Sequence, residues 1–201
     1  MKTNFDTFTL EAEQQARLEQ FIQLLTRWNK THNLTAIKDR QTMLSHHLYD
    51  SLSIQDYLEG ERIADIGSGG GLPAIPLALV NPDRHFTLIE SNGKKVGFLR
   101  QAAIELELEN MAVVHSRVEE YHPEQRFDLI MSRAFAAIGD FVAQSQHLLQ
   151  KKGLWLAMKG QLPDEELAAL ADNFEYTVKQ LAVPELDADR HLIIIKKQLN
   201  D

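Results

Sequence analysis

The first sixty residues carry the hydrophobic pattern of amphipathic helices. From Leu18 to Trp28, apolar side chains recur at three- and four-residue spacing, which places them on one face of a helix. Residues 29–35 interrupt that pattern. A second helix is predicted from about residue 39 to residue 60, where leucines recur every four positions. We therefore predict a helical extension over residues 1–60.

Beyond residue 60 the pattern changes to short apolar runs that alternate with helical segments. The apolar runs predict five strands, at 62–66, 85–90, 111–116, 127–132 and 154–159. The segments between and after them predict four helices, at 72–80, 94–109, 138–150 and 163–173. Alternation of this kind is typical of βαβ units, in which helices cover both faces of a mainly parallel sheet.

Two more strand-like segments close the chain, at residues 175–183 and 191–199, and only seven residues separate them. A return to a parallel strand needs a dozen or more residues, so we predict that these two strands are antiparallel. The expected fold class is α/β, a Rossmann-like, seven-stranded and mostly parallel sheet with an antiparallel last strand. We assign this domain to residues 61–201, with the extension 1–60 packed on it.

A glycine-rich loop joins the first strand to its helix within "RIADIGSGGGLPAIPLALV", residues 62–80. Glycine accepts positive φ angles and keeps side chains away from a ligand. The loop also lies at the carboxyl end of a strand, where open α/β sheets bind ligands. Two ligand templates fit it. One is the GxGxxA form of dinucleotide-binding loops, and the other is the acid followed by GxGxG of S-adenosylmethionine enzymes.

Two acidic residues and the strand order bear on the choice between these ligands. Asp65, two residues before Gly67, disfavours a pyrophosphate and suits a ligand with an ammonium group, as methionine has. Glu90 ends the second strand, where an acid accepts hydrogen bonds from ribose hydroxyls of either ligand. The antiparallel final pair favours a methyltransferase sheet. An NAD-dependent oxidoreductase and a non-catalytic adenosylmethionine- or nucleotide-sensing module stay open as alternatives.

The motifs "ADIGSGGGLPAIPLAL", "SRAFA", "MKG" and "RHLIIIKK", with the upstream "WNKTHNLT" and "HHLYDS", resemble the bacterial 16S ribosomal RNA guanine-N7 methyltransferase family, also called glucose-inhibited division protein B. The resemblance covers nearly the whole chain in order. It implies S-adenosylmethionine as the methyl donor and a guanine in the 530 loop of the small-subunit RNA as the substrate. A methyltransferase of another RNA or of a small molecule is the alternative.

The resemblance also implies where the cofactor binds. Its pattern places contacts on Gly67, Leu72, the pair Val118 and Glu119, and Arg133. Together with the loop and the two acids, the predicted cofactor residues are Asp65, Gly67, Ser68, Gly69, Leu72, Glu90, Val118, Glu119 and Arg133. The chain departs from the family pattern at Ala74, where glycine is common, and we expect Ala74 to lie within the helix.

Methylation at guanine N7 needs no general base, because that nitrogen has a free lone pair and no proton. Catalysis then depends on position and electrostatics. We predict Arg133 as the catalytic residue, holding the cofactor or donating to O6 and N7 of the guanine. Asn33, Lys159 and Arg190 are candidate RNA contacts. No metal site is predicted, because cysteine is absent and adjacent histidines point to different faces of a helix.

The composition is that of a globular protein, with 44% hydrophobic and 25% charged residues. No membrane span or secretory signal is visible, so we expect a cytoplasmic protein, and nothing demands more than a monomer. The net charge of -8 counts against an RNA partner unless basic residues gather locally. We expect some of the cations near strands two, five and seven to form one basic face: Lys94, Lys95, Arg100, Lys151, Lys152, Lys159, Arg190, Lys196 and Lys197.

Overall fold

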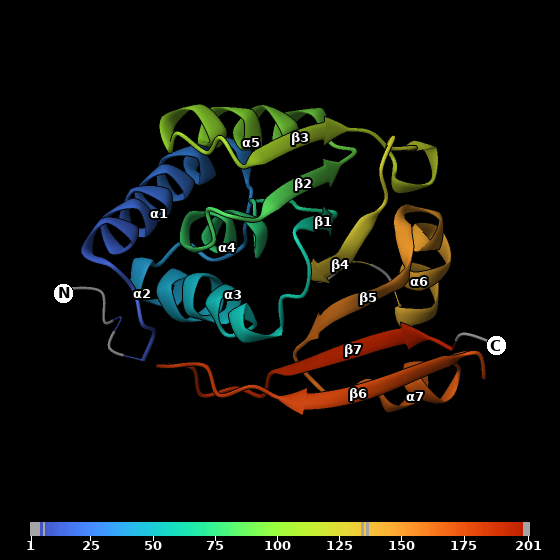
Figure 1. Ribbon diagram of the computed structural model, residues 1–201. Coiled ribbons are helices and arrows are strands. Elements are labelled where there is room, and N and C mark those ends of the chain that lie inside the picture. Colours follow the sequence, from blue (N-terminus) through green and yellow to red (C-terminus); the bar gives the residue numbers. More distant parts are fainter. Residues whose placement is uncertain (1–4, 6, 134, 136, 199–201) are drawn as a thin grey trace.

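The computed structural model describes residues 5, 7–133, 135 and 137–198. Within them a single seven-stranded sheet runs in the order β3-β2-β1-β4-β5-β7-β6 (Figure 1). The strands are β1 (Arg62–Ile66), β2 (His85–Glu90), β3 (Met111–His115), β4 (Phe127–Arg133), β5 (Leu149–Lys159), β6 (Phe174–Gln180) and β7 (His191–Lys197). β1 to β5 are parallel, and β7 is antiparallel to both of its neighbours. The predicted fold class is confirmed, and β7 lies between β5 and β6 in the sheet.

Helices cover both faces of the sheet. Among the described residues the main α-helices are α1 (Ala12–His32), α4 (Ala74–Val80), α5 (Gly93–Glu105), α6 (Ile138–Ser145) and α7 (Asp164–Ala168). Short helical segments are α2 (Arg40–Met43), the π-helix η1 (Leu44–Tyr49), α3 (Asp50–Leu52) and the 3-10 turns η2 (Gln55–Tyr57), η3 (Val118–Glu120) and η4 (Gln146–Leu148). Among the described residues no helix is long and apolar enough to cross a membrane.

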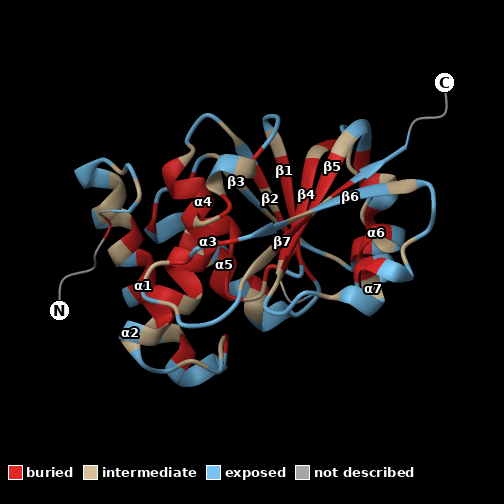
Figure 2. Ribbon diagram, turned by 90° about the horizontal axis from the view of Figure 1, so that it is seen from below, coloured by how far each residue is buried: buried red, intermediate tan, exposed pale blue. Residues whose placement is uncertain are grey.

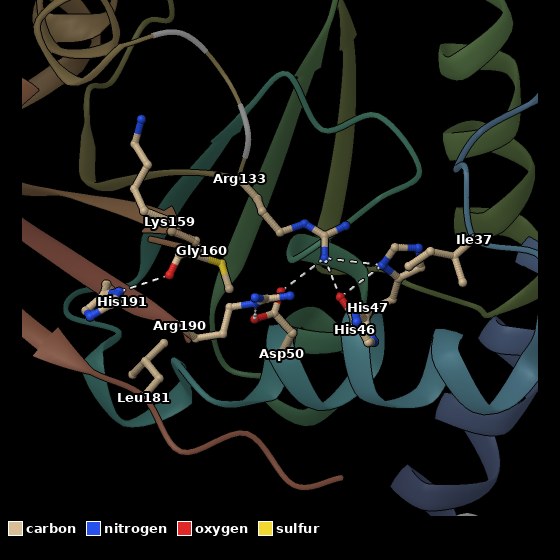
Figure 3. Close-up of a pocket in the computed structure, with 11 residues that line it drawn as sticks. Ile37, His46, His47, Asp50, Arg133, Lys159, Gly160, Leu181, Arg190 and His191 are labelled. Atoms are coloured by element: carbon tan, nitrogen blue, oxygen red, sulfur yellow. Dashed lines mark hydrogen bonds and ion pairs between the residues drawn. The ribbon is translucent and has the colours of Figure 1, made fainter. Parts of the chain in front are cut away.

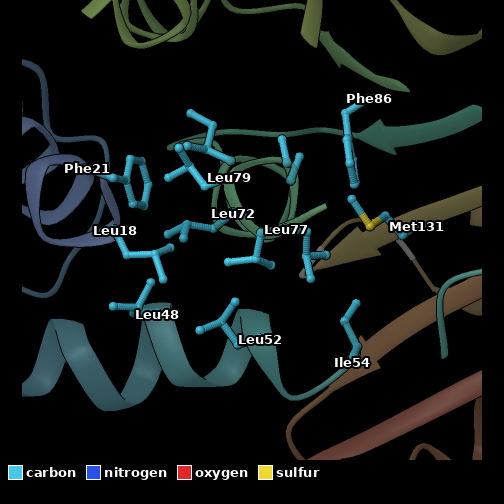
Figure 4. Close-up of a cluster of buried hydrophobic side chains, with 14 of the residues drawn as sticks. Leu18, Phe21, Leu48, Leu52, Ile54, Leu72, Leu77, Leu79, Phe86 and Met131 are labelled. Atoms are coloured by element: carbon cyan, nitrogen blue, oxygen red, sulfur yellow. The ribbon is translucent and has the colours of Figure 1, made fainter. Parts of the chain in front are cut away.

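Side chains of successive strand residues point to opposite faces of the sheet, so alternate residues belong to two different hydrophobic clusters. Leu129 and Met131 of β4 point to the cluster beneath α1, α3, α4 and α5, whereas Ile130 points to the cluster beneath α6. Leu18 and Phe21 of α1 pack with Leu72 and the α4 leucines in the first cluster (Figure 4). The central strands and α4 are therefore buried, while β6 is largely exposed (Figure 2).

The N-terminal helices share the first cluster with the sheet domain. Packing of the extension on the domain follows directly from that shared core. The division of the chain at residue 61 stays a prediction, because a common core does not define a boundary.

Four predicted helices differ from the observed ones. The helix expected over 94–109 ends at Glu105. The helix expected over 39–60 is broken into α2, η1, α3 and η2, with a π-helix in its middle. The helix expected over 138–150 ends at Ser145, and the one expected over 163–173 ends at Ala168. Only Leu167 of the latter helix is buried, so there is little apolar area to stabilise a longer one.

The fifth strand begins five residues before the prediction. Leu149 pairs with Phe127, and the regular register resumes only at Leu154 with Leu129. The polar residues 150–152 and Gly153 therefore form an irregular insertion in β5. A polar run with glycine has the composition of a loop, so the hydrophobic pattern alone could not reveal this start.

All four central parallel strands end at one edge of the sheet, which we call the carboxyl edge. The glycine loop, Glu90, Arg133 and Lys159 lie at the ends of β1, β2, β4 and β5, respectively. β7 begins at the same edge, because His191 pairs with Lys159. Residues far apart in sequence thus meet where open α/β sheets bind ligands.

Candidate functional site

The loop after β1 is held in a conformation that only glycine adopts easily. Gly67, Gly69 and Gly71 have φ angles of 69°, 56° and 76°. A Cβ on Gly71 would lie 2.3 Å from Cδ1 of Ile75, and one on Gly67 would lie 3.0 Å from the ring of Phe135. The loop therefore presents backbone instead of side chains at the carboxyl edge.

Asp65 is a buried acid at the end of β1. Its side chain is 1% exposed, and among the described residues neither carboxylate oxygen has a hydrogen-bond partner. Burial raises the pKa of Asp65 well above its usual value, and the positive charge of Arg133 offsets part of that increase. An unsatisfied buried carboxylate is costly, so this one fits the ammonium group of the predicted ligand.

Glu90 is also buried, but both of its oxygens are engaged. Oε2 accepts a hydrogen bond from the backbone N–H of Gly69 at 2.9 Å, and Oε1 accepts one from the backbone N–H of Asn92 at 2.8 Å. Glu90 thereby fixes the glycine loop against the end of β2. Each carboxylate oxygen has a further lone pair, which is available to a ribose hydroxyl.

A cleft of about 110 Å³, the cofactor cleft, lies beside the loop. Gly67, Val118, Glu119 and Phe135 are among the residues that line it, so three predicted cofactor residues meet there. Its remaining lining residues are Ile66, Ile89, Ser91, Ser116, Arg117 and Gln144.

Two other predicted cofactor residues serve the loop itself. The Ser68 hydroxyl donates to the backbone oxygen of Asp65, and the Leu72 side chain packs in the hydrophobic core. Ala74 is the first residue of α4 and is fully buried, as expected, and Pro73 precedes the helix as its N-cap.

A second and larger pocket, the Arg133 pocket, has a volume of about 470 Å³ (Figure 3). It is lined by Ile37, His46, His47, Asp50, Arg133, Met158, Lys159, Gly160, Leu181, Arg190 and His191. The site thus combines the ends of β4 and β5, the start of β7 and the broken helix of the extension. Two of the three predicted RNA contacts, Lys159 and Arg190, lie in this pocket with Arg133.

Asp50 binds two arginines in this pocket. Its Oδ2 accepts from Nη1 of Arg133 at 3.2 Å, and its Oδ1 accepts from Nε of Arg190 at 3.0 Å (Figure 3). Nη1 of Arg133 also donates to the backbone oxygen of His46 at 3.1 Å. Among the described residues, Nε and Nη2 of Arg133 have no such partner. The catalytic candidate is therefore anchored through one nitrogen and keeps donors for a ligand.

His47 lies against Arg133 and is neutral at pH 7. Burial, and then the positive charge of Arg133, lower the pKa of His47 to about 4. Its Nδ1 lies 3.0 Å from the backbone oxygen of His46, which can only accept, and 3.4 Å from Nη1 of Arg133, which can only donate. We assign the proton to Nδ1, because the contact with the oxygen is the shorter one. Nε2 then accepts from the Thr35 hydroxyl at 2.7 Å.

The segment 33–35 ends α1 and also contacts a residue of the Arg133 pocket. Asn33 ends α1 with a left-handed φ of 50°, and the backbone N–H of Thr35 donates to Oδ1 of Asn29. Thr35 then contacts His47, which lines the Arg133 pocket. Asn33 itself lies outside that pocket and borders a separate hollow with Lys30 and Lys38.

Lys159 is paired at the rim of the Arg133 pocket. Its ammonium lies 2.8 Å from Oε2 of Glu166 on α7, and Glu166 also accepts from the backbone N–H of Ile138 at the start of α6. Through Glu166, Lys159 thus connects the end of β5 to α7 and to the start of α6.

Asp50 and His47 line the Arg133 pocket, and the sequence pattern alone did not identify either of them. Both belong to the motif "HHLYDS", in which the paired histidines bear only on a metal site. A buried acid three residues after a histidine on an apolar helix face was the available signal, because positions i and i+3 share a face. The π-helix over Leu44–Tyr49 is a feature that often marks functional sites.

The nine cations of the expected basic face do not all share one surface. Lys159 and Arg190 lie at the carboxyl edge, whereas Lys196 and Lys197 lie toward the opposite end of β7, beside the start of β5 and Lys151. The two ends of β7 lie at opposite edges of the sheet, and because β7 is antiparallel it is the start of the strand, next to Arg190, that lies at the carboxyl edge.

The family profile described as "rRNA small subunit methyltransferase G", GidB, matches residues 14–193. The chain belongs to this family. It is 49% identical over 189 residues to the ribosomal RNA small subunit methyltransferase G of Salmonella agona, covering 94% of this chain and 91% of the relative. The protein of Salmonella typhimurium matches equally well. The chain is therefore an S-adenosylmethionine-dependent methyltransferase of small-subunit ribosomal RNA.

Solved structures agree on the fold. A putative O-methyltransferase from Klebsiella pneumoniae has a TM-score of 0.61 at 13% identity, and the match covers 97% of this chain and 94% of that one. P. horikoshii TYW2 in complex with MeSAdo has a TM-score of 0.58 at 11% identity, with 75% and 62% covered. At such identities these structures support the fold of the GidB family member and not its substrate.

Proposed function

We propose that this enzyme transfers a methyl group from S-adenosylmethionine to N7 of a guanine in the 530 loop of 16S ribosomal RNA. The observation that carries this proposal is the position of Arg133. It lines the larger pocket, and it ends β4 two residues after Met131, which pairs with Asp65 of β1 beside the glycine loop. One arginine thus connects a site that suits a methyl donor with a pocket that can hold a base.

The donor site is assigned to residues around the cofactor cleft. Asp65 accepts the methionine ammonium, Glu90 accepts ribose hydroxyls, and Gly67 and Gly69 leave room for the ligand. Val118 and Glu119 line the cleft on its other side, and Ser68 and Leu72 hold the loop. When bound, S-adenosylmethionine supplies an electrophilic methyl group on its sulfonium.

The acceptor site is assigned to the Arg133 pocket. Guanine presents O6 and N7 as acceptors on one edge, and Nε or Nη2 of Arg133 can donate to O6 while N7 stays free. Asp50 holds the guanidinium in place through Nη1, and neutral His47 adds no further positive charge. Because N7 carries no proton, position and electrostatics supply the catalysis, and Lys159, Arg190 and Asn33 are proposed to contact the surrounding RNA.

The proposed substrate is 16S rRNA within the small ribosomal subunit or an assembly intermediate. A cytoplasmic monomer is part of the same proposal. A pocket that takes one base requires the guanine to leave its stacked position, which is less costly in a loop than in a duplex.

The test is methyl transfer from labelled S-adenosylmethionine to small subunits purified from cells that lack the enzyme. We expect one label per subunit, located at a single guanine of the 530 loop, where borohydride reduction followed by aniline should cleave the RNA as it does at N7-methylguanine. Label elsewhere would contradict the assigned substrate. Arg133→Ala should abolish transfer while the protein stays folded, and near-normal turnover would contradict the role of Arg133.

A further inference from the structure

A basic groove lies at the edge of the sheet opposite the active site. It has a volume of about 440 Å³ and is formed by the start of β5, the end of β7 and the loop before β4. We call it the amino-edge groove. Its charged lining residues are Arg126, Lys151 and Lys197, and Gln146, Gln150 and Gln198 add three carboxamides. Figure 1 shows the end of β7 beside α6, on the side where this groove lies.

The charges of this groove are not neutralised by the described part of the chain. No carboxylate is among its lining residues, and Arg126, Lys151 and Lys197 take part in no ion pair there. The cations at the active site behave differently, because Arg133 and Arg190 share Asp50 and Lys159 binds Glu166. On a chain with a net charge of -8, three unpaired cations around one hollow form a local site for anions.

The groove suits phosphates and not unstacked bases. Its aromatic lining residue among those described is Trp155, which is 1% exposed and donates its indole N–H to Ser145. A buried ring offers no face on which a base could stack. Arginine, lysine and carboxamide groups are common donors to phosphate oxygens and to ribose hydroxyls.

The groove lies within reach of the RNA that enters the active site. Arg126 immediately precedes β4, and Arg133 is the last residue of that strand. At about 3.3 Å per strand residue, roughly 20 Å separate the two ends. A folded RNA that places one loop at Arg133 can therefore place the backbone of a neighbouring segment at the groove.

We propose that the amino-edge groove binds the phosphate backbone of the substrate RNA at a second contact, separate from the methyl-transfer site. This inference rests on the proposed function, since it takes ribosomal RNA as the partner. Binding there is independent of base sequence, and it strengthens substrate binding without taking part in the chemistry.

The test compares two triple variants that remove the same charge. Arg126→Gln, Lys151→Gln and Lys197→Gln neutralise the groove. The control, Arg17→Gln, Arg27→Gln and Arg84→Gln, removes three cations from α1 and from the loop before β2, which line neither the groove nor the Arg133 pocket. Both are assayed for methyl transfer to small subunits over a series of salt concentrations. Binding of each to protein-free 16S rRNA and to S-adenosylmethionine is measured in parallel.

For the groove variant we expect KM for subunits to rise about tenfold at low salt, with kcat and S-adenosylmethionine affinity unchanged. The slope of log affinity for RNA against log salt should fall by about one for each phosphate that the groove no longer binds, and the control variant should keep the wild-type slope.

Equal effects in both variants, or none in the groove variant, would overturn the proposal. So would weaker binding to subunits with unchanged binding to protein-free RNA, because that result assigns the groove to a protein partner. Wild-type transfer to subunits tests the proposed function separately, so a failure of that function would show before the variants are compared.

Discussion

Replacing Asp65 by asparagine should affect stability and cofactor binding in opposite directions. The carboxylate is almost fully buried, and neither oxygen has a hydrogen-bond partner among the described residues. Asparagine has nearly the same shape and carries no charge. Asp65→Asn therefore removes a desolvation cost from the cofactor-free protein, and it also removes the partner that we assign to the methionine ammonium.

The structure sets the size of both effects. Asparagine leaves buried polar atoms unpaired as well, so the substitution relieves only the cost of burying the charge. We expect a gain of about 1 kcal/mol above the folded pKa of Asp65, or roughly 2–4 °C in Tm for a chain of this length. Burial raises the folded pKa of Asp65 above 3.8. The wild-type protein therefore loses stability as pH rises above 3.8, and the advantage of the variant should be larger at pH 8 than at pH 4.

Loss of a hydrogen bond to a charged group costs about 1.5–3 kcal/mol, or roughly a 10- to 100-fold weaker Kd for S-adenosylmethionine. Calorimetry measures both quantities on one sample, as the thermal transition of the cofactor-free protein and as the titration with S-adenosylmethionine. Asp50→Asn is the matched control, because Asp50 is similarly buried but binds two arginines. If Asp65→Asn lowers Tm and leaves the Kd unchanged, the assignment of Asp65 to the ammonium is refuted.

Three more predictions concern Asp50, His47 and Gly71. Asp50→Asn should destabilise the protein by about 3 kcal/mol, because it leaves Arg133 and Arg190 half-buried without their anion; a denaturant titration that shows no loss would contradict this. His47 should make the protein less stable as pH falls from 6.5 toward 4, since the unfolded imidazole takes up a proton first. The difference between wild type and His47→Gln should change by up to about 3 kcal/mol over that range, and a constant difference in pH-dependent unfolding would refute the low pKa. Gly71→Ala should lower the free energy of unfolding by at least about 2 kcal/mol, because the loop combines a positive φ with a 2.3 Å contact, and a wild-type Tm would contradict the strained loop.

Much of the fold could be predicted from the hydrophobic pattern. Six of the seven predicted strands agree with observed strands to within a few residues at each end, because short apolar runs between turns are distinctive. The antiparallel pair followed from the seven residues between its strands, since no crossover fits there. The start of β5 and the ends of α6 and α7 could not be predicted, because Leu149 pairs with Phe127 across a polar insertion that resembles a loop and the helix ends depend on how much apolar area each helix buries.

The site was predictable where it depends on one stretch of chain. The glycine loop and Asp65 are adjacent in sequence, so their chemistry could be inferred from one segment, and Arg133 follows from its place at the end of a strand. Asp50 could not be assigned this way, because it lies 83 residues from Arg133 and 140 from Arg190. Only the packing of the extension brings it between them.

The sequence by itself determined the order of strands and helices along the chain, the loop predicted to bind the cofactor and the family to which the chain belongs. These depend on local pattern and on motifs that each occupy a single stretch. The tertiary structure decided which charges neutralise one another and which do not. Asp50 pairs with two arginines, whereas the carboxylate of Asp65 has no hydrogen-bond partner among the described residues. Arg190 and Lys197 lie at opposite ends of β7 and therefore at opposite edges of the sheet. Electrostatic energies depend on distance and burial, and those exist only once the chain has folded.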